Sequence, residues 1–488
     1  MRRQWPLTKS KIISFLQCPK WLWLEVHKPN EKDETEEMQA RFLVGHHVGD
    51  IARTQYPKGV LIEHPDNFNA AIAATQAAMS SRIPVFEAAF QHDNVRVRTD
   101  LMLPKPRSWH TAEVKSAGEV KDHHLNDLAV QTSVLKNAGI RVSRSTIRHI
   151  NKQFVYPGGG NYRGLLTDAE ADREVKELLP EVRGWVAAAR KTLSGREPGI
   201  EMGKHCNDPW ACPFQGYCTK LAGTGAAYPV DLLPRGRSLV EKLKSEGYDD
   251  LREVPADRMT TDLFRRIHAA TKTGKPYVDR EGAHRAMSSW KYPRAYLDFE
   301  TIGFAVPIWE GTRPFQQIPF QWSCHIERPD GAVTHREFLD LSGNNPARAC
   351  AEKLVKGLRG CRMIIAHHAG VERNIMRGLA ATFPDLRAPL LRLAEVVVDL
   401  LPVVKEHYYH RDMLGSYSIK AILPALAPRF SYDNLDEVTD GLAAQRAYAE
   451  AIHPATPDSR KVELERKLRR YCALDSEGMI AVARRLTK

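Results

Sequence analysis

Three evenly spaced cysteines constrain the fold of the first part of this chain more than any other feature. Cys206, Cys212 and Cys218 lie in the segment HCNDPWACPFQGYC, in which prolines and a glycine favour turns that bring the three sulfurs toward one point. In a reducing cytosol such a set is more typical of metal or cluster ligation than of disulfide bonds. Cys18 stands near the start of the chain. It can join the trio only if the fold returns to it, so we expect one domain whose two ends meet.

Four thiolates suit either a zinc ion or an iron-sulfur cluster, and both stay open on these residues alone. The other cysteines, Cys324, Cys350, Cys361 and Cys472, are scattered through the C-terminal part of the chain. We expect these four to be ordinary core thiols.

The remaining pattern indicates two α/β domains separated by a helical segment. A chain of 488 residues is long enough for two or three domains, each with its own core. We expect an α/β domain over 1–222, a helical connector over 223–290 and a second α/β domain over 291–488. The connector is either a helix-hairpin-helix-like contact with duplex nucleic acid or a plain spacer.

Hydrophobic periodicity and turn residues predict the elements of each part. The helices expected in the first domain are 9–24, with a break at Pro19, then 36–54, 68–79, 123–138 and 168–193, and its strands are 95–102, 109–115 and 144–150. The connector is predicted to hold helices over 237–247 and 260–271 and no strand. The strands expected in the second domain are 294–301, 320–327, 333–339 and 363–367, and its last helix is 460–486.

Charge and hydropathy narrow the class of protein. Lysine plus arginine exceed aspartate plus glutamate by 71 − 59 = 12, an excess that favours a polyanionic partner, nucleic acid first. A solvated basic surface is the alternative, because the surplus is spread along the chain. No stretch approaches the ~18 uninterrupted apolar residues of a membrane span, and no cleavage pattern follows the basic N-terminus. We expect a cytoplasmic protein with no membrane partner.

A first carboxylate set lies on two predicted strands. Glu113 and Lys115 are separated by one residue, so both side chains leave the same face of the sheet. Asp100 lies on the neighbouring strand and comes close if the two strands form a hairpin. Metal-assisted phosphodiester hydrolysis uses such a pair, because the carboxylate binds a divalent ion while the lysine orients or deprotonates water and offsets negative charge.

These residues and their order resemble the RecB-like nucleases of the PD-(D/E)XK superfamily, especially the CRISPR-associated Cas-four branch. The resemblance spans roughly residues 8–220 and rests on CPKWLWL, GHHVG, Asp100, EVK, a glutamine in the next helix and the late cysteines. It implies a magnesium- or manganese-dependent DNA nuclease with a 4Fe-4S cluster. The resemblance makes Asp100 and Glu113 metal ligands, Lys115 catalytic, Gln131 a supporting polar residue, and Cys18, Cys206, Cys212 and Cys218 the cluster ligands.

Two departures from this family matter. The related nucleases often place a metal-facing histidine where Gly49 stands here, and His46 is one helical turn earlier on nearly the same face. His46 is therefore either a metal ligand or a surface histidine. The equal spacing of the late cysteines also departs from the family, which keeps zinc as the alternative to the cluster.

A second carboxylate set lies in the last domain. In RAYLDFET, Asp298 and Glu300 share one strand face, and an acidic pair on a central strand is costly to hold unless cations neutralise it. In YCALD, Tyr471 stands one helical turn before Asp475. We expect Asp475 to complete a metal site while the tyrosine hydroxyl orients a water molecule.

This opening D-x-E pair and the late Y-x-x-x-D resemble the DnaQ-like exonucleases of the DEDDy type, which have an RNase H fold. The resemblance covers about residues 294–486. The middle motif departs from the family, because AHHAGVER places Glu372 where an aspartate is expected. Glu372 can still bind metal, although its longer side chain shifts the oxygens. The alternative is an RNase H-like domain retained for binding nucleic acid.

Together the two halves predict a DNA nuclease with two phosphodiesterase centres. Single-stranded DNA or DNA ends are the expected substrate, in defence against foreign DNA or in repair. The alternatives are a nucleic-acid-binding adaptor with one or both centres inactive, and a nuclease directed at RNA. The sequence does not identify a protein partner.

Overall fold

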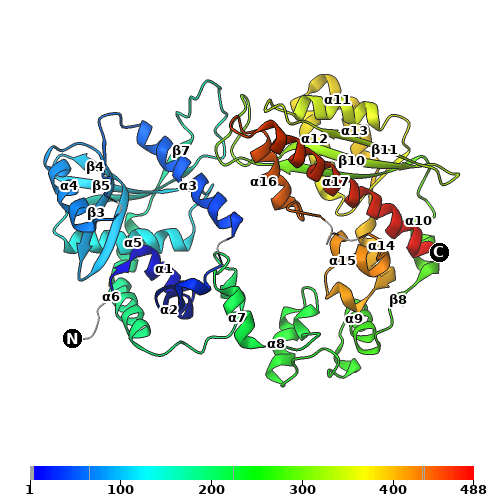
Figure 1. Ribbon diagram of the computed structural model, residues 1–488, viewed down its shortest axis with the longest axis horizontal. Coiled ribbons are helices and arrows are strands. Elements are labelled where there is room, and N and C mark those ends of the chain that lie inside the picture. Colours follow the sequence, from blue (N-terminus) through cyan, green and yellow to red (C-terminus); the bar gives the residue numbers. More distant parts are fainter. Residues whose placement is uncertain (1–4, 34, 65, 224, 431, 433–434) are drawn as a thin grey trace. The chain divides into compact units, whose positions relative to one another are not determined.

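The computed structural model describes residues 5–33, 35–64, 66–223, 225–430, 432 and 435–488. The chain divides into two compact units of mixed α/β structure (Figure 1). Unit 1 comprises Met1–Thr224 and Phe304–Phe315, and unit 2 comprises Gly225–Gly303 and Gln316–Lys488. Strands and helices alternate in both units, so the chain has the α/β class expected from its sequence.

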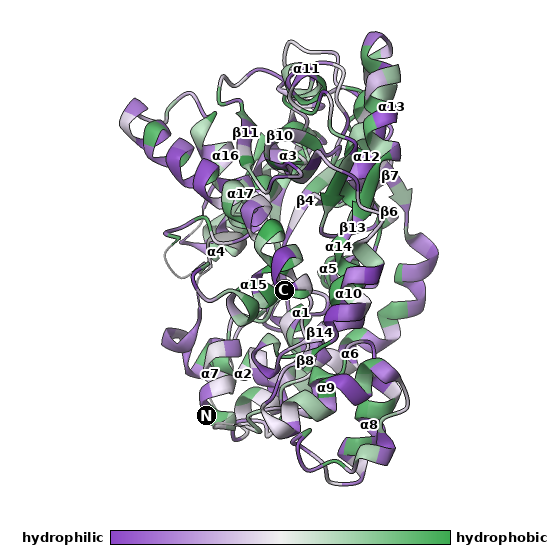
Figure 2. Ribbon diagram, turned by 90° about the vertical axis from the view of Figure 1, so that its right-hand side faces the viewer, coloured by the Kyte–Doolittle hydropathy of each residue, from purple (hydrophilic) through white to green (hydrophobic). Residues whose placement is uncertain are grey.

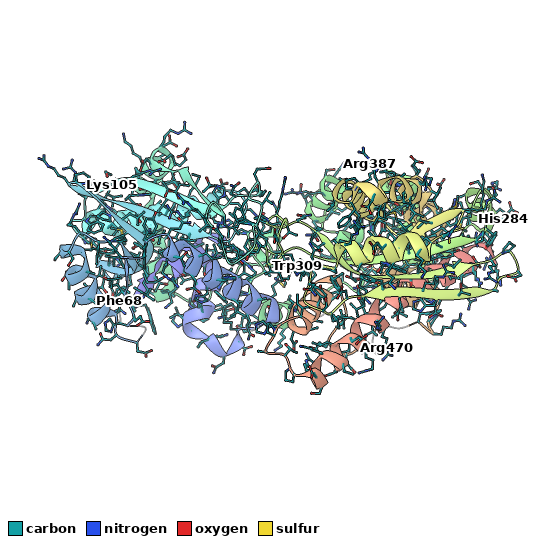
Figure 3. All side chains as sticks on the ribbon, turned by 90° about the horizontal axis from the view of Figure 1, so that it is seen from above. Phe68, Lys105, His284, Trp309, Arg387 and Arg470 are labelled. Carbon is teal, nitrogen blue, oxygen red and sulfur yellow. The ribbon has the colours of Figure 1, made fainter. Side chains whose placement is uncertain are left out.

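Unit 1 is built on a seven-stranded sheet with the order β2-β3-β4-β5-β6-β7, and β1 pairs with β4. The strands are β1 (Leu7–Thr8), β2 (Val60–Leu61), β3 (Val85–His92), β4 (Val95–Lys105), β5 (Ser108–Lys115), β6 (Val142–Ile150) and β7 (Leu166–Glu170). β4 and β5 form an antiparallel hairpin, whose turn end is marked by Lys105 in Figure 3, and β6 runs parallel to β5. The hairpin is the arrangement that the first carboxylate set requires.

The helices of unit 1 are α1 (Lys9–Gln17), α2 (Pro19–His27), α3 (Glu36–Thr54), α4 (Phe68–Ser80), α5 (Asp122–Asn137), α6 (Asp172–Ser194) and α7 (Gln215–Ala222). Cys18 separates α1 from α2 with an extended backbone, and Pro19 begins the new helix. Proline is tolerated there because a first-turn N–H has no partner within the helix. The helix break expected at Pro19 is therefore present, and it leaves Cys18 with an extended backbone between the two helices.

Four of the seven strands of this sheet were not predicted, the short β1 and β2 and the longer β3 and β7. β3 was not predicted, because most of its residues are buried and the apolar-polar alternation of a half-exposed strand is missing. Residues 166–170 form β7, antiparallel to β6, so the helix expected from 168 begins only at Asp172. The prediction of a helix over 168–171 was wrong because strand pairing overrode the local pattern.

A segment between two strands of unit 2 belongs to unit 1. Residues 304–315 follow β9 in the chain but pack against the loop after β6, where Tyr156 N donates to Thr312 O at 2.9 Å and Gly311 N donates to Tyr156 O at 2.8 Å. Val306 shares a small apolar core with Phe154. The chain therefore passes between the units three times, which the contiguous boundaries expected from the sequence did not include.

Unit 2 is built on a five-stranded mixed sheet with the order β11-β10-β9-β12-β13. The strands are β9 (Arg294–Ile302), β10 (Ile318–Glu327), β11 (Val333–Leu339), β12 (Met363–Ala366) and β13 (Val397–Asp399). β10 runs antiparallel to both of its neighbours, and β12 runs parallel to β9 and β13. The central strand β9 carries the D-x-E pair.

Helices cover this sheet on the sides where its strands are apolar. They are α11 (Ala347–Gly357), α12 (Gly370–Thr382), α13 (Arg387–Glu395), α14 (Leu400–His407), α15 (Ile419–Leu426), α16 (Gly441–Ala451) and α17 (Asp458–Thr487). α17 packs on β9 and β10, and hydrophilic and hydrophobic residues alternate along its ribbon (Figure 2). Its C-terminal half is the more deeply buried part, from Tyr471 to Leu486.

The segment 225–290 shares its core with the rest of unit 2. It contains α8 (Arg237–Ser245), α9 (Asp262–Thr273), β8 (Tyr277–Val278) and α10 (Arg280–Met287), and β8 pairs with β14 (Tyr408–Tyr409). The apolar residues that it contributes include Leu243, Leu251 and Phe264, in one cluster with residues of α14 and α17. The prediction of no strand in this segment was wrong, because the segment contains the short β8. Two residues are too few to give a periodic signal in the sequence.

Within the described residues, no helix is both long and apolar enough to cross a lipid bilayer.

A substitution at Gly415 can test whether the shared core depends on the close approach of the segment 225–290 to the rest of unit 2. Its φ is +76°, and a Cβ there would overlap the backbone carbonyl of Leu232. We expect Gly415→Ala to lower the free energy of unfolding by roughly 3 kcal/mol, through backbone strain and the clash. Denaturant unfolding measures this change.

Gly378→Ala is the matched control, because a Cβ at this helical position meets open space. It should raise stability by about 0.5 to 1 kcal/mol, since alanine is the better helix former. Equal effects of the two substitutions would contradict the packing described for residue 415.

Candidate metal centres

The first carboxylate set comes together on the β4–β5 hairpin. Glu113, only 2% exposed, lies across from Asp100, whose Oδ2 accepts a hydrogen bond from Val114 N at 2.6 Å. Lys115 Nζ lies 2.9 Å from Glu113 Oε1, as the one-residue spacing on a strand predicts. The structure thus brings Asp100, Glu113 and Lys115 to one place.

Two further charged residues complete this centre. Asp127 on α5 is 8% exposed, and its Oδ2 lies 2.5 Å from Lys115 Nζ. Lys9, the first residue of α1, places its Nζ 2.7 Å from both oxygens of Glu113. Asp127 precedes Gln131 by one helical turn, a spacing that could have identified it. Nothing in the local sequence singles out Lys9.

Gln131 is fully buried and ties α5 to the hairpin. Its Nε2 donates to Thr111 Oγ1 at 2.9 Å, and its Oε1 accepts from Lys9 Nζ at 3.3 Å. The side chain therefore has a fixed orientation at the edge of the carboxylate set, as a supporting polar residue requires.

The charged groups of this centre shift one another's pKa values. Burial and the neighbouring Asp100 raise the pKa of Glu113 to about 7, although Lys115 and Lys9 oppose this. Burial opposes the charge on Lys115, but Asp127 and Glu113 raise its pKa above the ordinary value. Lys115 therefore keeps its proton at neutral pH in the metal-free protein. Of the two roles expected for this lysine, charge compensation fits the site better than deprotonation of water.

His46 is exposed on α3, and no hydrogen bond or ion pair joins it to Asp100 or Glu113 among the described residues. Its assignment as a metal ligand or a surface histidine stays a prediction. Among the histidines of this helix, His47 has an aromatic neighbour, Tyr162, at 6.3 Å between ring centroids.

The four cysteines of unit 1 surround one small cavity. Cys18, Cys206, Cys212 and Cys218 all line it. Gln17 fastens the cysteine loop to α1, because its Nε2 donates to His205 O and Trp210 O, each at 2.7 Å. Cys212 N also donates to Cys206 O at 2.7 Å. The two ends of the domain meet here, as Cys18 and the late trio require.

Four thiols can hold more than one kind of metal group. A zinc tetrahedron uses four thiolates with Zn–S bonds of about 2.3 Å, and an iron-sulfur cluster is also held by four thiolates. Burial also raises the pKa of Cys212 to about 12, so binding must displace protons. Four converging thiols around one cavity therefore suit either a zinc ion or an iron-sulfur cluster.

The second carboxylate set converges in unit 2 from one strand and two helices. Asp298 and Glu300 lie on β9, Glu372 on α12 and Asp475 on α17. Glu300, Glu372 and Asp475 are 7%, 4% and 5% exposed. The negative charges of Asp475, Glu300 and Glu372 each raise the pKa of Asp298. The four carboxylates therefore interact electrostatically as one site.

Two tyrosines and a lysine flank Asp475. The hydroxyl of Tyr432 donates to Asp475 Oδ1, and Tyr471 is 3% exposed one helical turn before the carboxylate. Lys420 places its Nζ 4.9 Å from the centroid of the Tyr471 ring. Tyr432 follows α15 in a segment without a recognisable motif, which is why the sequence did not identify it.

The pKa values of the carboxylates of this centre are raised in the metal-free protein. Burial, followed by the charge of Asp475, raises the pKa of Glu300 to about 8, and burial raises that of Glu372 to about 8. Burial and the other three carboxylates raise the pKa of Asp298 well above its ordinary value. A divalent cation would remove this penalty, so the donor set fits magnesium or manganese.

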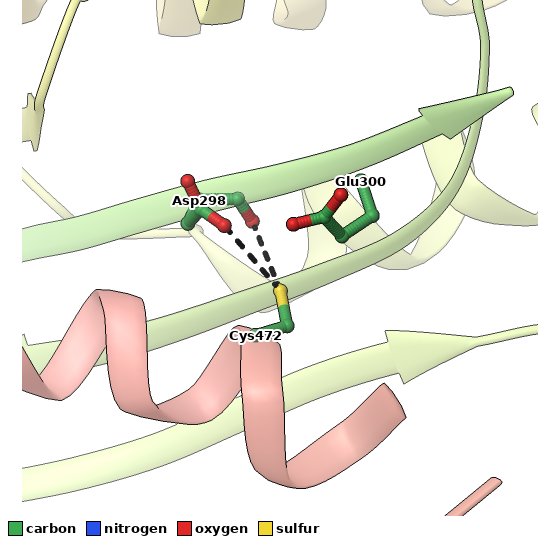
Figure 4. Close-up of side chains that lie close together, drawn as sticks. All are labelled: Asp298, Glu300 and Cys472. Atoms are coloured by element: carbon green, nitrogen blue, oxygen red, sulfur yellow. Dashed lines mark hydrogen bonds between the residues drawn. The ribbon is translucent and has the colours of Figure 1, made fainter. Parts of the chain in front are cut away.

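A thiol also faces this centre. Cys472 follows Tyr471 on α17, and its Sγ lies 3.7 Å from both the backbone oxygen and Oδ2 of Asp298 (Figure 4). Ligand atoms of Asp298, Glu300 and Cys472 all lie within 4.8 Å of one another. The residue is buried, as expected of a core thiol, but the prediction did not place it beside carboxylates.

Comparisons with known proteins give two matches. Residues 295–418 match a family described as a domain of unknown function, DUF2779. An uncharacterized protein from Mycoplasma pneumoniae (strain ATCC 29342 / M129 / Subtype 1), described as an MG366 homolog, is 22% identical over 251 residues. This match covers 46% of the chain and 37% of that protein's own length. The DUF2779 match includes Asp298, Glu300 and Glu372, and it ends before Tyr471 and Asp475.

The buried carboxylates of unit 2 predict a specific dependence of stability on pH. Glu300 has an ordinary pKa of 4.5 and a folded pKa of about 8. Between these pH values the folded protein holds a proton that the unfolded chain has released, so the free energy of unfolding falls as pH rises. We expect metal-free Glu300→Gln to lose less stability across this window than the wild type, measured by denaturant unfolding.

Wild-type protein saturated with Mn²⁺ is the control, because a bound cation should flatten the same slope. Stability of the metal-free wild type that rises through this window would contradict the assignment.

The cysteine cage predicts a visible cofactor. Protein purified without oxygen should be brown and contain iron and sulfide, and Cys206→Ser should remove the colour and the iron. Cys361→Ser is the matched control, since this thiol lies in unit 2, outside the cage. Iron and acid-labile sulfide analysis makes the measurement, and stoichiometric zinc without iron would exclude the cluster.

Proposed function

We propose that this protein is a metal-dependent DNA nuclease with two phosphodiesterase centres, one in each unit. In this proposal unit 1 is a PD-(D/E)XK nuclease domain of the RecB-like type with a 4Fe-4S cluster, and unit 2 is a DnaQ-like domain with an RNase H fold. The observation that carries the proposal is the convergence of four carboxylates, three of them less than 9% exposed, on the central strand of unit 2. Buried acids at this density fit a site that takes up cations.

In unit 2, Asp298, Glu300, Glu372 and Asp475 are the residues that would hold magnesium or manganese. The bound ions would supply charge neutralisation and a water molecule of lowered pKa. Tyr471 and Tyr432 bring hydroxyl groups to Asp475, where they can orient a water molecule by hydrogen bonding. Burial of the site limits bulk water and strengthens each of these interactions.

In unit 1, Asp100 and Glu113 would hold the metal, while the ammonium of Lys115 offsets charge that develops on the phosphate. Gln131 fixes the hairpin to α5, and Asp127 holds Lys115 in place at 2.5 Å. The cysteine cage closes the same unit around α1, which carries Lys9 at its start and ends at Cys18. The cage therefore supports the helix from which one charge of the centre comes.

The net charge of +12 favours a nucleic-acid substrate, and the resemblance to RecB-like enzymes favours DNA, as single strands or ends. The role would be defence against foreign DNA or repair, in the cytoplasm. RNA is the alternative substrate, because DnaQ-like folds process both.

One observation favours a second candidate function, a nucleic-acid-binding adaptor. Lys9 contacts both oxygens of Glu113, so a protein cation already occupies one side of the first centre. If this ion pair persists with metal present, unit 1 would bind nucleic acid without hydrolysing it.

The two centres can be tested separately on labelled DNA. We expect Lys115→Ala and Asp298→Ala each to lower the activity of their own centre by on the order of 100-fold or more, because each removes a charge that the reaction requires. The assay compares single- and double-stranded DNA and matched RNA, with Mg²⁺ or Mn²⁺.

Lys176→Ala and Asp257→Ala are the controls, because both side chains are exposed and lie outside the carboxylate sets. Divalent-dependent degradation that survives Lys115→Ala and Asp298→Ala combined would exclude the proposal. Tight, salt-sensitive binding without turnover would support the adaptor.

A further inference from the structure

We propose that Asp298, Glu300 and Cys472 form a three-ligand site for a thiophilic divalent cation, with zinc as the biological candidate. The site lies within the second carboxylate set, so this inference deepens the proposed function of unit 2 by assigning its metal preference. It also gives a role to a thiol that the nuclease mechanism does not use.

The geometry brings three donors of different kinds to one point. Glu300 and Asp298 lie two residues apart on β9, and Cys472 approaches from α17 (Figure 4). One ligand atom from each residue lies within 4.8 Å of the other two. Cys472 Sγ is 3.7 Å from Asp298 Oδ2, and a modest contraction around an ion would bring both into bonding range.

Two buried carboxylates of the second set have oxygens without a protein partner. Glu300 is 7% exposed, and no hydrogen bond or ion pair joins its side chain to another described residue. Glu372 is 4% exposed, and its Oε2 has no hydrogen-bond partner among the described residues. An unpaired buried carboxylate is costly, and Lys420, the nearby cation, donates instead to the backbone oxygen of Thr439 at 2.8 Å. A cation bound by Asp298, Glu300 and Cys472 would satisfy the oxygens of Glu300.

The identity of the donors selects the metal. Magnesium takes oxygen ligands in an octahedral arrangement, and a thiol contributes nothing to it. Zinc accepts sulfur and oxygen together, and three protein ligands with a fourth open position are typical of its catalytic sites. On binding, the Cys472 S–H bond breaks, the proton leaves to solvent and a metal–sulfur bond forms without any change of oxidation state.

The consequence is competition between two metals for Asp298 and Glu300. Magnesium or manganese would use these carboxylates with Asp475, whereas zinc would draw them toward Cys472 on α17. Bound zinc would then withdraw two ligands from the proposed hydrolytic ions, so the thiol makes the second centre sensitive to zinc.

Zinc binding can be measured on the full chain purified with its cysteine cage loaded. Competition with a chromogenic chelator gives the Zn²⁺ affinity, and Co²⁺ replaces zinc as a spectroscopic probe whose thiolate charge-transfer band reports a sulfur ligand. We expect Cys472→Ser to lower Zn²⁺ affinity by at least about 100-fold, since even residues that only orient ligands contribute about 10- to 100-fold. The Co²⁺ band should disappear, and Mg²⁺ binding should not change.

Cys350→Ser is the matched control, because this thiol of unit 2 is also buried but no ionisable neighbour contributes to the shift of its pKa. Asp298→Asn keeps the thiol in place and should also weaken both the Zn²⁺ affinity and the Co²⁺ band. Wild-type Zn²⁺ affinity in Cys472→Ser, or an unchanged Co²⁺ band in Asp298→Asn, would overturn the inference. Because neither measurement needs activity, a protein that binds zinc through Cys472 without degrading DNA would refute the proposed function alone.

Discussion

The burial of negative charge on the central strand of unit 2 is the constraint on which the second centre depends. β9 pairs with β12 over Arg294–Tyr296 and with β10 through Asp298 and Glu300, so the backbone that carries the acidic pair is fixed in the sheet. α17 packs on the same strand and adds Asp475, and α12 adds Glu372. Each helix therefore increases the repulsion between carboxylates. Lys420 opposes the rise in pKa of Glu300 and Asp475, and Arg373 opposes that of Glu372, but the pKa values remain raised. Burial and mutual repulsion raise the pKa values of these carboxylates in the metal-free fold, which favours their neutral forms.

Unit 1 handles the same problem differently. Two lysines offset part of its negative charge, because Glu113 has ion pairs with both Lys9 and Lys115 and Asp127 is held by Lys115. These pairs are buried, and their Coulomb attraction mainly offsets desolvation. The first centre is thus partly compensated without metal, although Asp100 still raises the pKa of Glu113. A cation that enters unit 1 must displace or rearrange Lys9, and a cation that enters unit 2 meets no such competitor among the described residues.

Much of the fold and of both carboxylate sets could be predicted from the sequence, because strand and helix periodicity fixes which side chains share a face. A spacing of two residues on a strand puts Asp298 and Glu300 on one face. A spacing of four residues on a helix does the same for Tyr471 and Asp475. A hairpin between the two strands brings Asp100 close to Glu113. The contributions of Lys9, Asp127, Tyr432 and Cys472 depend on tertiary packing between distant segments. No local pattern encodes that packing, and β3 was missed for the related reason that burial on both faces removes alternation.

The segment 304–315 has a consequence for how this chain can be divided. It leaves β9 directly after the acidic pair, and its backbone is hydrogen-bonded to the loop after β6 in unit 1. Cutting the chain once, near residue 224, would remove from unit 1 a piece of its own core and leave unit 2 with an unanchored loop beside its acidic strand. The units are therefore not interchangeable modules in the genetic sense. Recombination that exchanged either unit for a homologue would have to preserve this inserted loop as well, so the two halves are constrained to evolve together.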